Sequence, residues 1–222
     1  MPEAVHASQN NSQFYDRISH AYDALSDASE HEAREAGERA LAVQPGEQVL
    51  EIGYGTGHAL VDLARAVGPA GKVNGLDVSE GMRAVAANRV REAGFESIVD
   101  LRIGDARRLP FGDGRFDAAF LSFTLELFEL DDIPAVLAEI RRVLRLGGRL
   151  GIVAMATVED GKHEGLLERG YQWMHRHFPH IVDCQPIDAA RLLARAGFEI
   201  THNERLEIWT MPVTVITGRK PA

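Results

Sequence analysis

Short hydrophobic runs alternate with longer amphipathic segments over most of the chain. The short runs have the length of buried strands, and the longer segments space their apolar residues three and four apart, as helices do. The strands expected from this pattern are residues 48–52, 72–77, 98–103, 116–122 and 150–155. The helices expected are residues 59–67, 81–93, 133–144 and 188–196. Because parallel strands need crossover connections, the alternation predicts a mostly parallel sheet with helices on both faces.

The start of the chain departs from this alternation. Residues 1–12 are polar and aperiodic, which predicts a flexible arm. Residues 14–43 carry helical spacing with few turn signals, so we expect two helices before the break at Pro45-Gly46.

The second half also interrupts the alternation. Gly147-Gly148 is expected to end the helix that starts at residue 133. Residues 158–183 predict a helix outside the regular order, placed to cover a cleft. Residues 198–209 and 213–218 then predict a hairpin around Met211-Pro212, so the sheet should close with an antiparallel strand.

Composition narrows the class of protein. The chain has 222 residues, which suits one domain of ordinary size. It carries 24 Lys and Arg against 33 Asp and Glu, a net charge of −9 that disfavours nucleic acid as a partner. No apolar stretch has the length of a membrane span, and the single Cys184 cannot form an intrachain disulfide. We therefore expect a soluble cytoplasmic protein with no membrane span.

The strongest local signal is VLEIGYGTG, from Val49 to Gly57, in which a buried strand leads into three glycines and then a helix. Glycines permit close backbone approach, and the helix N-terminus offers unpaired N–H groups to a ligand. A tight turn without a ligand is the alternative reading of such a loop. The spacing G-x-G-x-G, with His58 where a dinucleotide fingerprint has its third glycine, opposes a nicotinamide-dependent oxidoreductase.

Three acidic residues occupy successive strand ends: Glu51, Asp77 and Asp105. Asp77 stands where a carboxylate can accept both hydroxyls of a ribose. Its alternative role is a helix N-cap beside Ser79, and the alternative for Asp105 is a turn residue. Together the three carboxylates predict one polar constellation at the carboxyl edge of the sheet.

Six motifs in this order resemble those of class I S-adenosylmethionine-dependent methyltransferases, most closely the ubiquinone/menaquinone C-methyltransferase branch. They are YDRISHAYD (15–23), VLEIGYGTG (49–57), GLDVSEGM (75–82), GDARRLPF (104–111), FDAAFLSFTLELF (116–128) and LRLGGRL (144–150). The resemblance implies a Rossmann-like seven-stranded, mostly parallel sheet with one antiparallel strand near the C-terminus. It also implies one methyltransferase domain over residues 13–222, with a small helical cap made by residues 13–44 and 158–183.

The resemblance further implies S-adenosylmethionine as the cofactor. The glycine loop would hold its methionine part, Asp77 the ribose and Asp105 the adenine amine. The full set of cofactor-binding residues that the resemblance implies is Tyr22, Glu51, Gly53, Gly55, Gly57, Asp77, Val78, Met82, Asp105, Ala106, Ser122 and Phe123. Where many similar enzymes have a small residue between the first two glycines, this chain has Tyr54, so its bulky ring must point away from the ligand or help to enclose it.

The expected reaction is methylation of a small, partly apolar acceptor at carbon, oxygen, nitrogen or sulfur. A base is needed only where the acceptor loses a proton, and the candidates are Tyr15, His20, His175, His177 and His180. A polar cap surface is the other reading of the three clustered histidines, and their spacing argues against a metal site. A cofactor sensor or non-catalytic partner subunit is the alternative function, and a homodimer is a candidate assembly.

Overall fold

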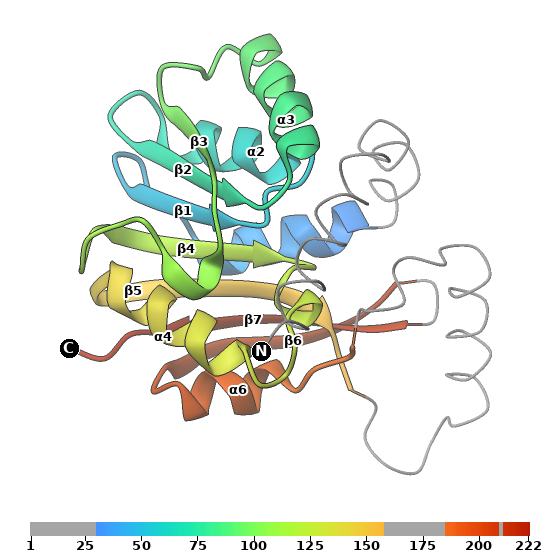
Figure 1. Cartoon of the computed structure of the whole chain (residues 1–222). Coiled ribbons are helices and arrows are strands. Elements are labelled where there is room, and N and C mark those ends of the chain that lie inside the picture. Colours follow the sequence, from blue (N-terminus) through green and yellow to red (C-terminus); the bar gives the residue numbers. More distant parts are fainter. Residues whose placement is uncertain (1–29, 158–184, 209–210) are drawn as a thin grey trace, which may run out of the picture.

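The computed structural model describes residues 30–157, 185–208 and 211–222, and its centre is a seven-stranded sheet in the order β3-β2-β1-β4-β5-β7-β6 (Figure 1). The strands are β1 (Gln48–Ile52), β2 (Lys72–Asp77), β3 (Val99–Ile103), β4 (Phe116–Ser122), β5 (Leu144–Met155), β6 (Glu199–Ile208) and β7 (Met211–Arg219). β1 to β5 pair in parallel, whereas β7 is antiparallel to both of its neighbours. The predicted fold class, with one antiparallel strand near the C-terminus, is confirmed.

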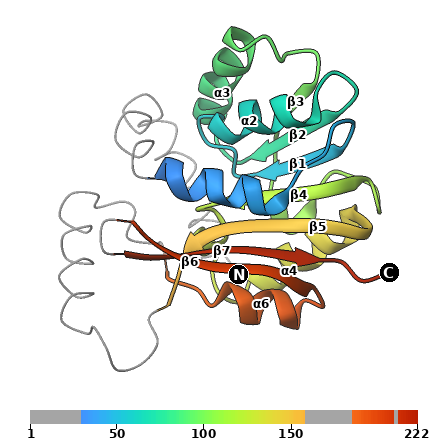
Figure 2. The ribbon, with the colours of Figure 1, turned by 180° about the vertical axis from the view of Figure 1, so that it is seen from behind.

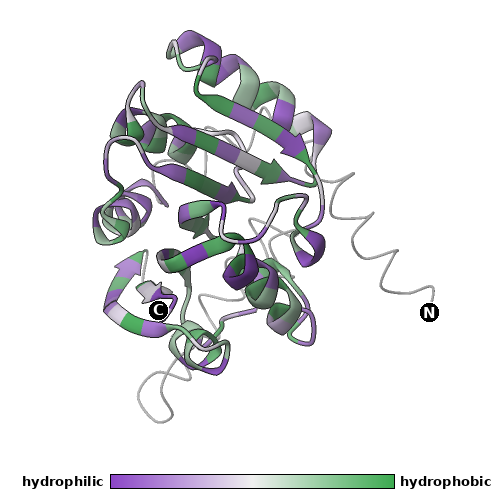
Figure 3. Cartoon of the chain, turned by 90° about the vertical axis from the view of Figure 1, so that its left-hand side faces the viewer, coloured by the Kyte–Doolittle hydropathy of each residue, from purple (hydrophilic) through white to green (hydrophobic). Residues whose placement is uncertain are grey.

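Helices cover both faces of this sheet. They are residues 30–41, α2 (His58–Val67), α3 (Glu80–Glu92), α4 (Ile133–Val143) and α6 (Ala189–Arg195), with 3₁₀ turns η1 (Ala106–Arg108) and η2 (Leu125–Leu127). One hydrophobic cluster joins α4 and α6 to one face, and a second joins the 30–41 helix, α2 and α3 to the other. Figures 1 and 2 show these two layers in turn, and Figure 3 shows apolar positions along the strands between them.

Local capping explains where the helices begin and end. Ser79 starts α3, because its Oγ accepts the N–H of Met82 at 3.1 Å. Gly94 and Gly197 follow α3 and α6 with φ of 78° and 81°, the left-handed conformation that glycine adopts freely. The two helices end at Glu92 and Arg195, each one residue before the end predicted from the sequence.

The expectation that Gly147-Gly148 ends a helix is wrong. α4 ends at Val143, and β5 begins at Leu144 and runs through the glycine pair. The register against β4 shifts between Phe116 and Ala118, which is a bulge that absorbs the extra residues of β5. The glycines also bind the end of the chain, because the Gly147 N–H donates to the carbonyl of Lys220 at 2.9 Å.

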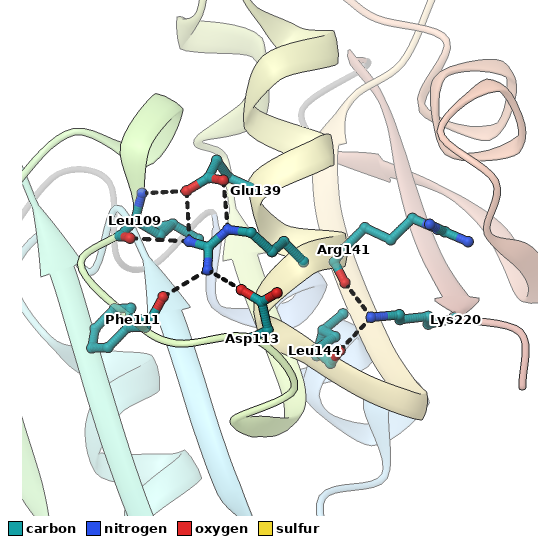
Figure 4. Close-up of polar contacts among 8 residues, drawn as sticks. Leu109, Phe111, Asp113, Glu139, Arg141, Leu144 and Lys220 are labelled. Atoms are coloured by element: carbon teal, nitrogen blue, oxygen red, sulfur yellow. Dashed lines mark hydrogen bonds and ion pairs between the residues drawn. The ribbon is translucent and has the colours of Figure 1, made fainter.

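Arg142 ties the loop between β3 and β4 to α4 (Figure 4). Its guanidinium donates to the carbonyls of Leu109 and Phe111 and to the carboxylates of Glu139 and Asp113. Lys220 binds the C-terminal end of the same helix, since its Nζ donates to the carbonyls of Arg141 and Leu144 at 2.7 Å. These contacts join α4 to the loop before β4 and tie Lys220 to the start of β5.

Several sequence predictions fall outside the described residues. The flexible arm (1–12), the first N-terminal helix and the cap segment (158–183) all do, and the 13–44 cap element is described only from residue 30. Within the described part of the chain, no helix is long and apolar enough to cross a membrane.

Candidate functional site

The loop from Gly53 to Gly57 joins β1 to α2, and its three glycines all have positive φ: 70°, 49° and 86°. A Cβ at Gly53 would lie 2.4 Å from the side chain of Thr124, and one at Gly57 would lie 2.9 Å from the Cβ of Ala86. A Cβ at Gly55 would meet nothing within 4 Å. The outer glycines are therefore required by packing, while the middle one borders open space where a ligand can approach the backbone.

Tyr54 leaves that space clear. Its ring is buried, and a Cβ on Gly75 of β2 would lie 2.7 Å from the ring atom Cδ1. The Tyr54 hydroxyl lies 3.5 Å from the carbonyl oxygen of Arg102 on β3. Of the two orientations that the sequence allowed, the structure shows the ring turned into the core, where its packing explains why residue 75 is glycine.

Asp77, at the end of β2, organises the loop from the side. Its Oδ2 accepts the N–H of Gly55 at 2.9 Å, and its Oδ1 accepts the N–H of Ser79 at 2.9 Å. A carboxylate accepts several hydrogen bonds at once, as this one does from the loop and from the start of α3. The helix N-cap is Ser79 itself, and Asp77 fixes the position of that cap.

Asp105 lies at the end of the next strand and caps η1, because its Oδ1 accepts the N–H of Arg107 at 2.8 Å. The Arg107 guanidinium binds the same carboxylate through Nε and Nη2, and it reaches Asp132 with Nη1 at 2.6 Å. Burial opposes ionisation of Asp105, but the hydrogen bonds from Arg107 outweigh it and lower the pKa of the carboxyl. The Asp105 side chain is 42% exposed, so the ion pair leaves one side of it open.

Glu51 is the buried member of the three carboxylates. It is 3% exposed, and its Oε2 has no hydrogen-bond partner among the described residues. Burial, followed by the charge of Glu38, raises the pKa of Glu51 well above its ordinary value, and Arg34 partly offsets this. An unpartnered carboxyl oxygen beside the glycine loop is a place where a cationic group would be stabilised.

The end of β4 borders the loop from the other side. Phe123 has φ of 49°, a left-handed conformation that an aromatic residue adopts only when its surroundings enforce it. Its N–H donates to the carbonyl of Val153, and Thr124 next to it donates from Oγ1 to the carbonyl of Ser122 at 2.9 Å. Thr124 also packs on Gly53, so the β4 end and the glycine loop form one unit.

Glu126 is a candidate site residue that was not predicted from the sequence. It is fully buried in η2, and its Oε1 accepts the N–H of Met155 at the end of β5. Its Oε2 has no partner within the described residues. Burial raises its pKa to about 7, although N–H donation from its own backbone and from Met155 lowers it somewhat. Nothing in the run LSFTLELF marks this glutamate, because only the pairing of β4 with β5 places it against Met155.

The remaining predicted site residues divide into two groups. Met82 and Ala106 are buried at the starts of α3 and η1, and Val78 is 41% exposed between β2 and α3. The five predicted aromatic and histidine candidates Tyr15, Tyr22, His175, His177 and His180, together with His20, lie outside the described residues. Among the residues that are described, no group of three histidine, cysteine or acidic side chains is arranged to hold a metal ion.

Comparison with known proteins identifies this arrangement. A family model described as a methyltransferase domain matches residues 49–148, which contain the glycine loop and all three carboxylates. A demethylmenaquinone methyltransferase of Desulfitobacterium hafniense is 30% identical over 199 residues, covering 82% of this chain and 76% of that protein. The chain belongs to the class I S-adenosylmethionine-dependent methyltransferases. Within that family it lies in the quinone C-methyltransferase-like branch.

A second relative shows how much of the chain the likeness covers. The 2-phytyl-1,4-naphtoquinone methyltransferase of Synechococcus elongatus is 37% identical over 145 residues, 64% of this chain. The chain spans only 61% of the length of that relative. Among solved structures, a 1,6-didemethyltoxoflavin-N1-methyltransferase of Burkholderia thailandensis with bound S-adenosylhomocysteine has a TM-score of 0.74 at 20% identity. The match covers all of this chain and 91% of the toxoflavin enzyme's chain, which shows that the two share a fold.

The cofactor of this family is S-adenosylmethionine, and the residues of the described edge fit it. The backbone at Gly55 is open to an approaching ligand, and its N–H is held by Asp77. The Oε2 of Glu51, which has no hydrogen-bond partner among the described residues, lies in the strand that leads into the loop, where a cationic group would be stabilised. Such a buried carboxyl oxygen would be costly in a loop that serves only as a turn.

Proposed function

We propose that this methyltransferase methylates a ring carbon of a small, partly apolar hydroquinone, with S-adenosylmethionine as the methyl donor. The observation that carries the proposal is the 30% identity to a demethylmenaquinone methyltransferase over most of both chains, and the hydrogen bond from the glycine loop to Asp77 supports it. No observation favours the alternative of a cofactor sensor or a non-catalytic subunit.

The geometry at the carboxyl edge of the sheet supports a set of proposed cofactor contacts. Gly53, Gly55 and Gly57 cradle the methionine part, and Glu51 attracts its ammonium group. Asp77 accepts the ribose hydroxyls beside its hydrogen bonds to Gly55 and Ser79.

Other residues form the proposed contacts with the adenine and with the methyl group of the cofactor. Val78, Met82 and Ala106 border the adenine, and Asp105 accepts from its amino group on the side away from Arg107. Ser122 and Phe123 line the methyl side. The fixed backbone of Phe123, bonded to Val153, keeps this wall in place.

The protein itself has to supply little chemical activation for methyl transfer. When bound, the cofactor supplies an activated sulfonium methyl group, so most of the acceleration comes from holding the acceptor carbon in line with it. The residues at the ends of β4 and β5 therefore act mainly by orientation and by excluding water. Glu126 lies on this side, and we propose that its Oε2, which has no partner within the described residues, takes the proton of an acceptor hydroxyl.

Tyr15, Tyr22, His175, His177 and His180 stay predictions as cap residues that close over the cofactor or act as an alternative base. A homodimer, a cytoplasmic location and the absence of a nucleic acid partner likewise remain predictions.

The test uses purified protein, S-adenosylmethionine and chemically reduced 2-prenyl-1,4-naphthoquinone. We expect a product one methyl group heavier by mass spectrometry, formed together with an equal amount of S-adenosylhomocysteine. Cofactor that binds but is never consumed, with this hydroquinone or with related phenols, would contradict the proposal and restore the sensor alternative.

A further inference from the structure

A cluster of charged groups lies between β1 and the helix at residues 30–41, which packs through Gly37 against Phe120 of β4 and Val153 of β5. Glu38 and Arg34 come from that helix and Glu51 comes from β1. Arg34 Nε lies 3.9 Å from Glu38 Oε1, which is longer than a hydrogen bond. Within the described residues, neither Oε1 of Glu38 nor Oε2 of Glu51 has a hydrogen-bond partner. Two buried carboxyl oxygens without partners are costly, and proteins retain such groups where a ligand or a proton needs them.

The charges around the cluster are mostly negative. Asp62 faces Glu38 from α2, and Asp77 adds to the field at Glu51 from the end of β2. Asp62 is itself paired with Arg65, so its charge is partly balanced. On the same helix as Glu38, the exposed pair Glu35 and Arg39 contributes charges of opposite sign that oppose each other. Arg34 is thus the cation nearest to an excess of buried acid among the described residues.

Such an excess of buried acid favours the protonated carboxyl groups. Burial is the largest cause that raises the pKa of Glu38, to about 8, and the charge of Asp62 adds to it. Burial likewise raises the pKa of Glu51, with Glu38 as the next cause. A positive charge brought close to the cluster would favour the ionised carboxylates and release a proton.

The glycine loop is where that charge arrives. Glu51 stands two residues before Gly53 in the same strand-to-loop segment. Charges buried in protein interact over longer distances than charges in water, so a cation above the loop acts on the cluster without touching it. S-Adenosylmethionine and S-adenosylhomocysteine differ by one methyl group and one positive charge, on sulfur. The cluster can therefore distinguish them by charge alone.

We propose that Glu38 and Glu51 hold a proton that passes to solvent when a cationic cofactor binds, so that the site prefers S-adenosylmethionine to S-adenosylhomocysteine increasingly as pH rises. This inference rests on the proposed cofactor site but not on the identity of the methyl acceptor. In the reaction, loss of the sulfonium charge returns the proton to the cluster and weakens the hold on the product. Glu38 is then a residue that acts on cofactor selectivity through its charge.

The experiment is calorimetric titration of the full chain with each cofactor form, in the absence of acceptor, from about pH 6 to about pH 8.5. Buffers of different ionisation enthalpy count the protons released. We expect more protons released by S-adenosylmethionine than by S-adenosylhomocysteine, and an affinity ratio that rises at least about threefold over this range. Glu38→Gln should flatten the rise, whereas Glu35→Gln, an exposed glutamate on the same helix, should retain it.

Glu51→Gln serves as the second variant if Glu38→Gln fails to fold, and it should flatten the rise in the same way. Equal proton release by the two cofactor forms, or an unchanged pH dependence in a folded Glu38→Gln protein, would overturn the inference. A failure of methyl transfer to the hydroquinone, with both cofactor forms bound and the charge preference present, would count against the proposed function alone. Failure of both cofactor forms to bind would overturn both.

Discussion

Asp77 and Gly55 join the ends of two neighbouring strands: the carboxylate Oδ2 at the end of β2 accepts the loop N–H after β1 at 2.9 Å. The same carboxylate holds Ser79 at the start of α3 through its other oxygen. One side chain thus sets the loop, the helix start and the acceptor positions proposed for the ribose.

Replacing Asp77 by Ala should weaken binding of S-adenosylhomocysteine by more than about tenfold, because both the ribose acceptor and the loop anchor are lost. Calorimetry on the folded variant measures this. Asp100→Ala on β3 is the matched control, since that carboxylate is exposed and pairs only with Arg102 among the described residues. Unchanged affinity in Asp77→Ala would remove the residue from the site.

Substitution by alanine should have different effects at Gly55 and at Gly57. Gly57→Ala places a Cβ against Ala86 at a φ of 86°, and we expect a loss of about 2–3 kcal/mol in the free energy of unfolding. Gly55→Ala meets no atom, so it should cost about 1–2 kcal/mol from its positive φ yet reduce cofactor affinity about tenfold or more. Denaturant unfolding and calorimetry separate the two effects. Normal cofactor binding by Gly55→Ala would show that the loop does not face the ligand.

Glu126 should give the reaction a pH dependence. Its proton-accepting form is the carboxylate, so the rate should rise as pH rises through about 7, the pKa that burial gives this group. Glu126→Gln keeps an oxygen for the Met155 N–H but should flatten that rise and lower kcat/KM for the hydroquinone by about tenfold to hundredfold. Glu129→Gln, an exposed neighbour, is the control. An identical pH profile in Glu126→Gln would assign the glutamate a structural role only.

Arg142 should matter for stability and not for the cofactor. It joins α4 to the carbonyls of Leu109 and Phe111 (Figure 4), so Arg142→Ala should lower the free energy of unfolding by about 1–3 kcal/mol. Arg65→Ala removes an exposed ion pair and should change it by less than about 0.5 kcal/mol. A clear loss of S-adenosylhomocysteine affinity in folded Arg142→Ala would contradict the expectation that Arg142 stabilises the fold without contributing to cofactor binding.

Most of the sheet can be predicted from the sequence because the ends of its strands depend on residues that are neighbours in the chain. Hydrophobic runs and glycine stops place the ends of β1, β2 and β4 at the observed residues. The error at Gly147-Gly148 arises because glycine ends a helix or forms a strand bulge with equal ease, and only the pairing of β5 with β4 and the contact with Lys220 decide between them.

The site is less predictable where it depends on contacts between distant segments. The positions of Glu51, Asp77 and Asp105 follow from strand ends, and the motif supplies their expected roles. That Tyr54 turns into the core follows from a space above Gly75, and that Glu126 faces Met155 follows from strand pairing. Neither the space above Gly75 nor the strand pairing can be predicted from the residues next to Tyr54 and Glu126 in the sequence.

Transfer of an isotopically labelled methyl group tests the central claim most directly. The protein is incubated with ¹³C-methyl S-adenosylmethionine and reduced 2-prenyl-1,4-naphthoquinone, and the product is examined by NMR, with Asp77→Ala in parallel. The account predicts one labelled methyl on a ring carbon for each S-adenosylhomocysteine formed, and a much slower reaction in Asp77→Ala at low cofactor concentration. Label that stays on the cofactor in the wild-type protein, or equal rates in the two proteins, would contradict it.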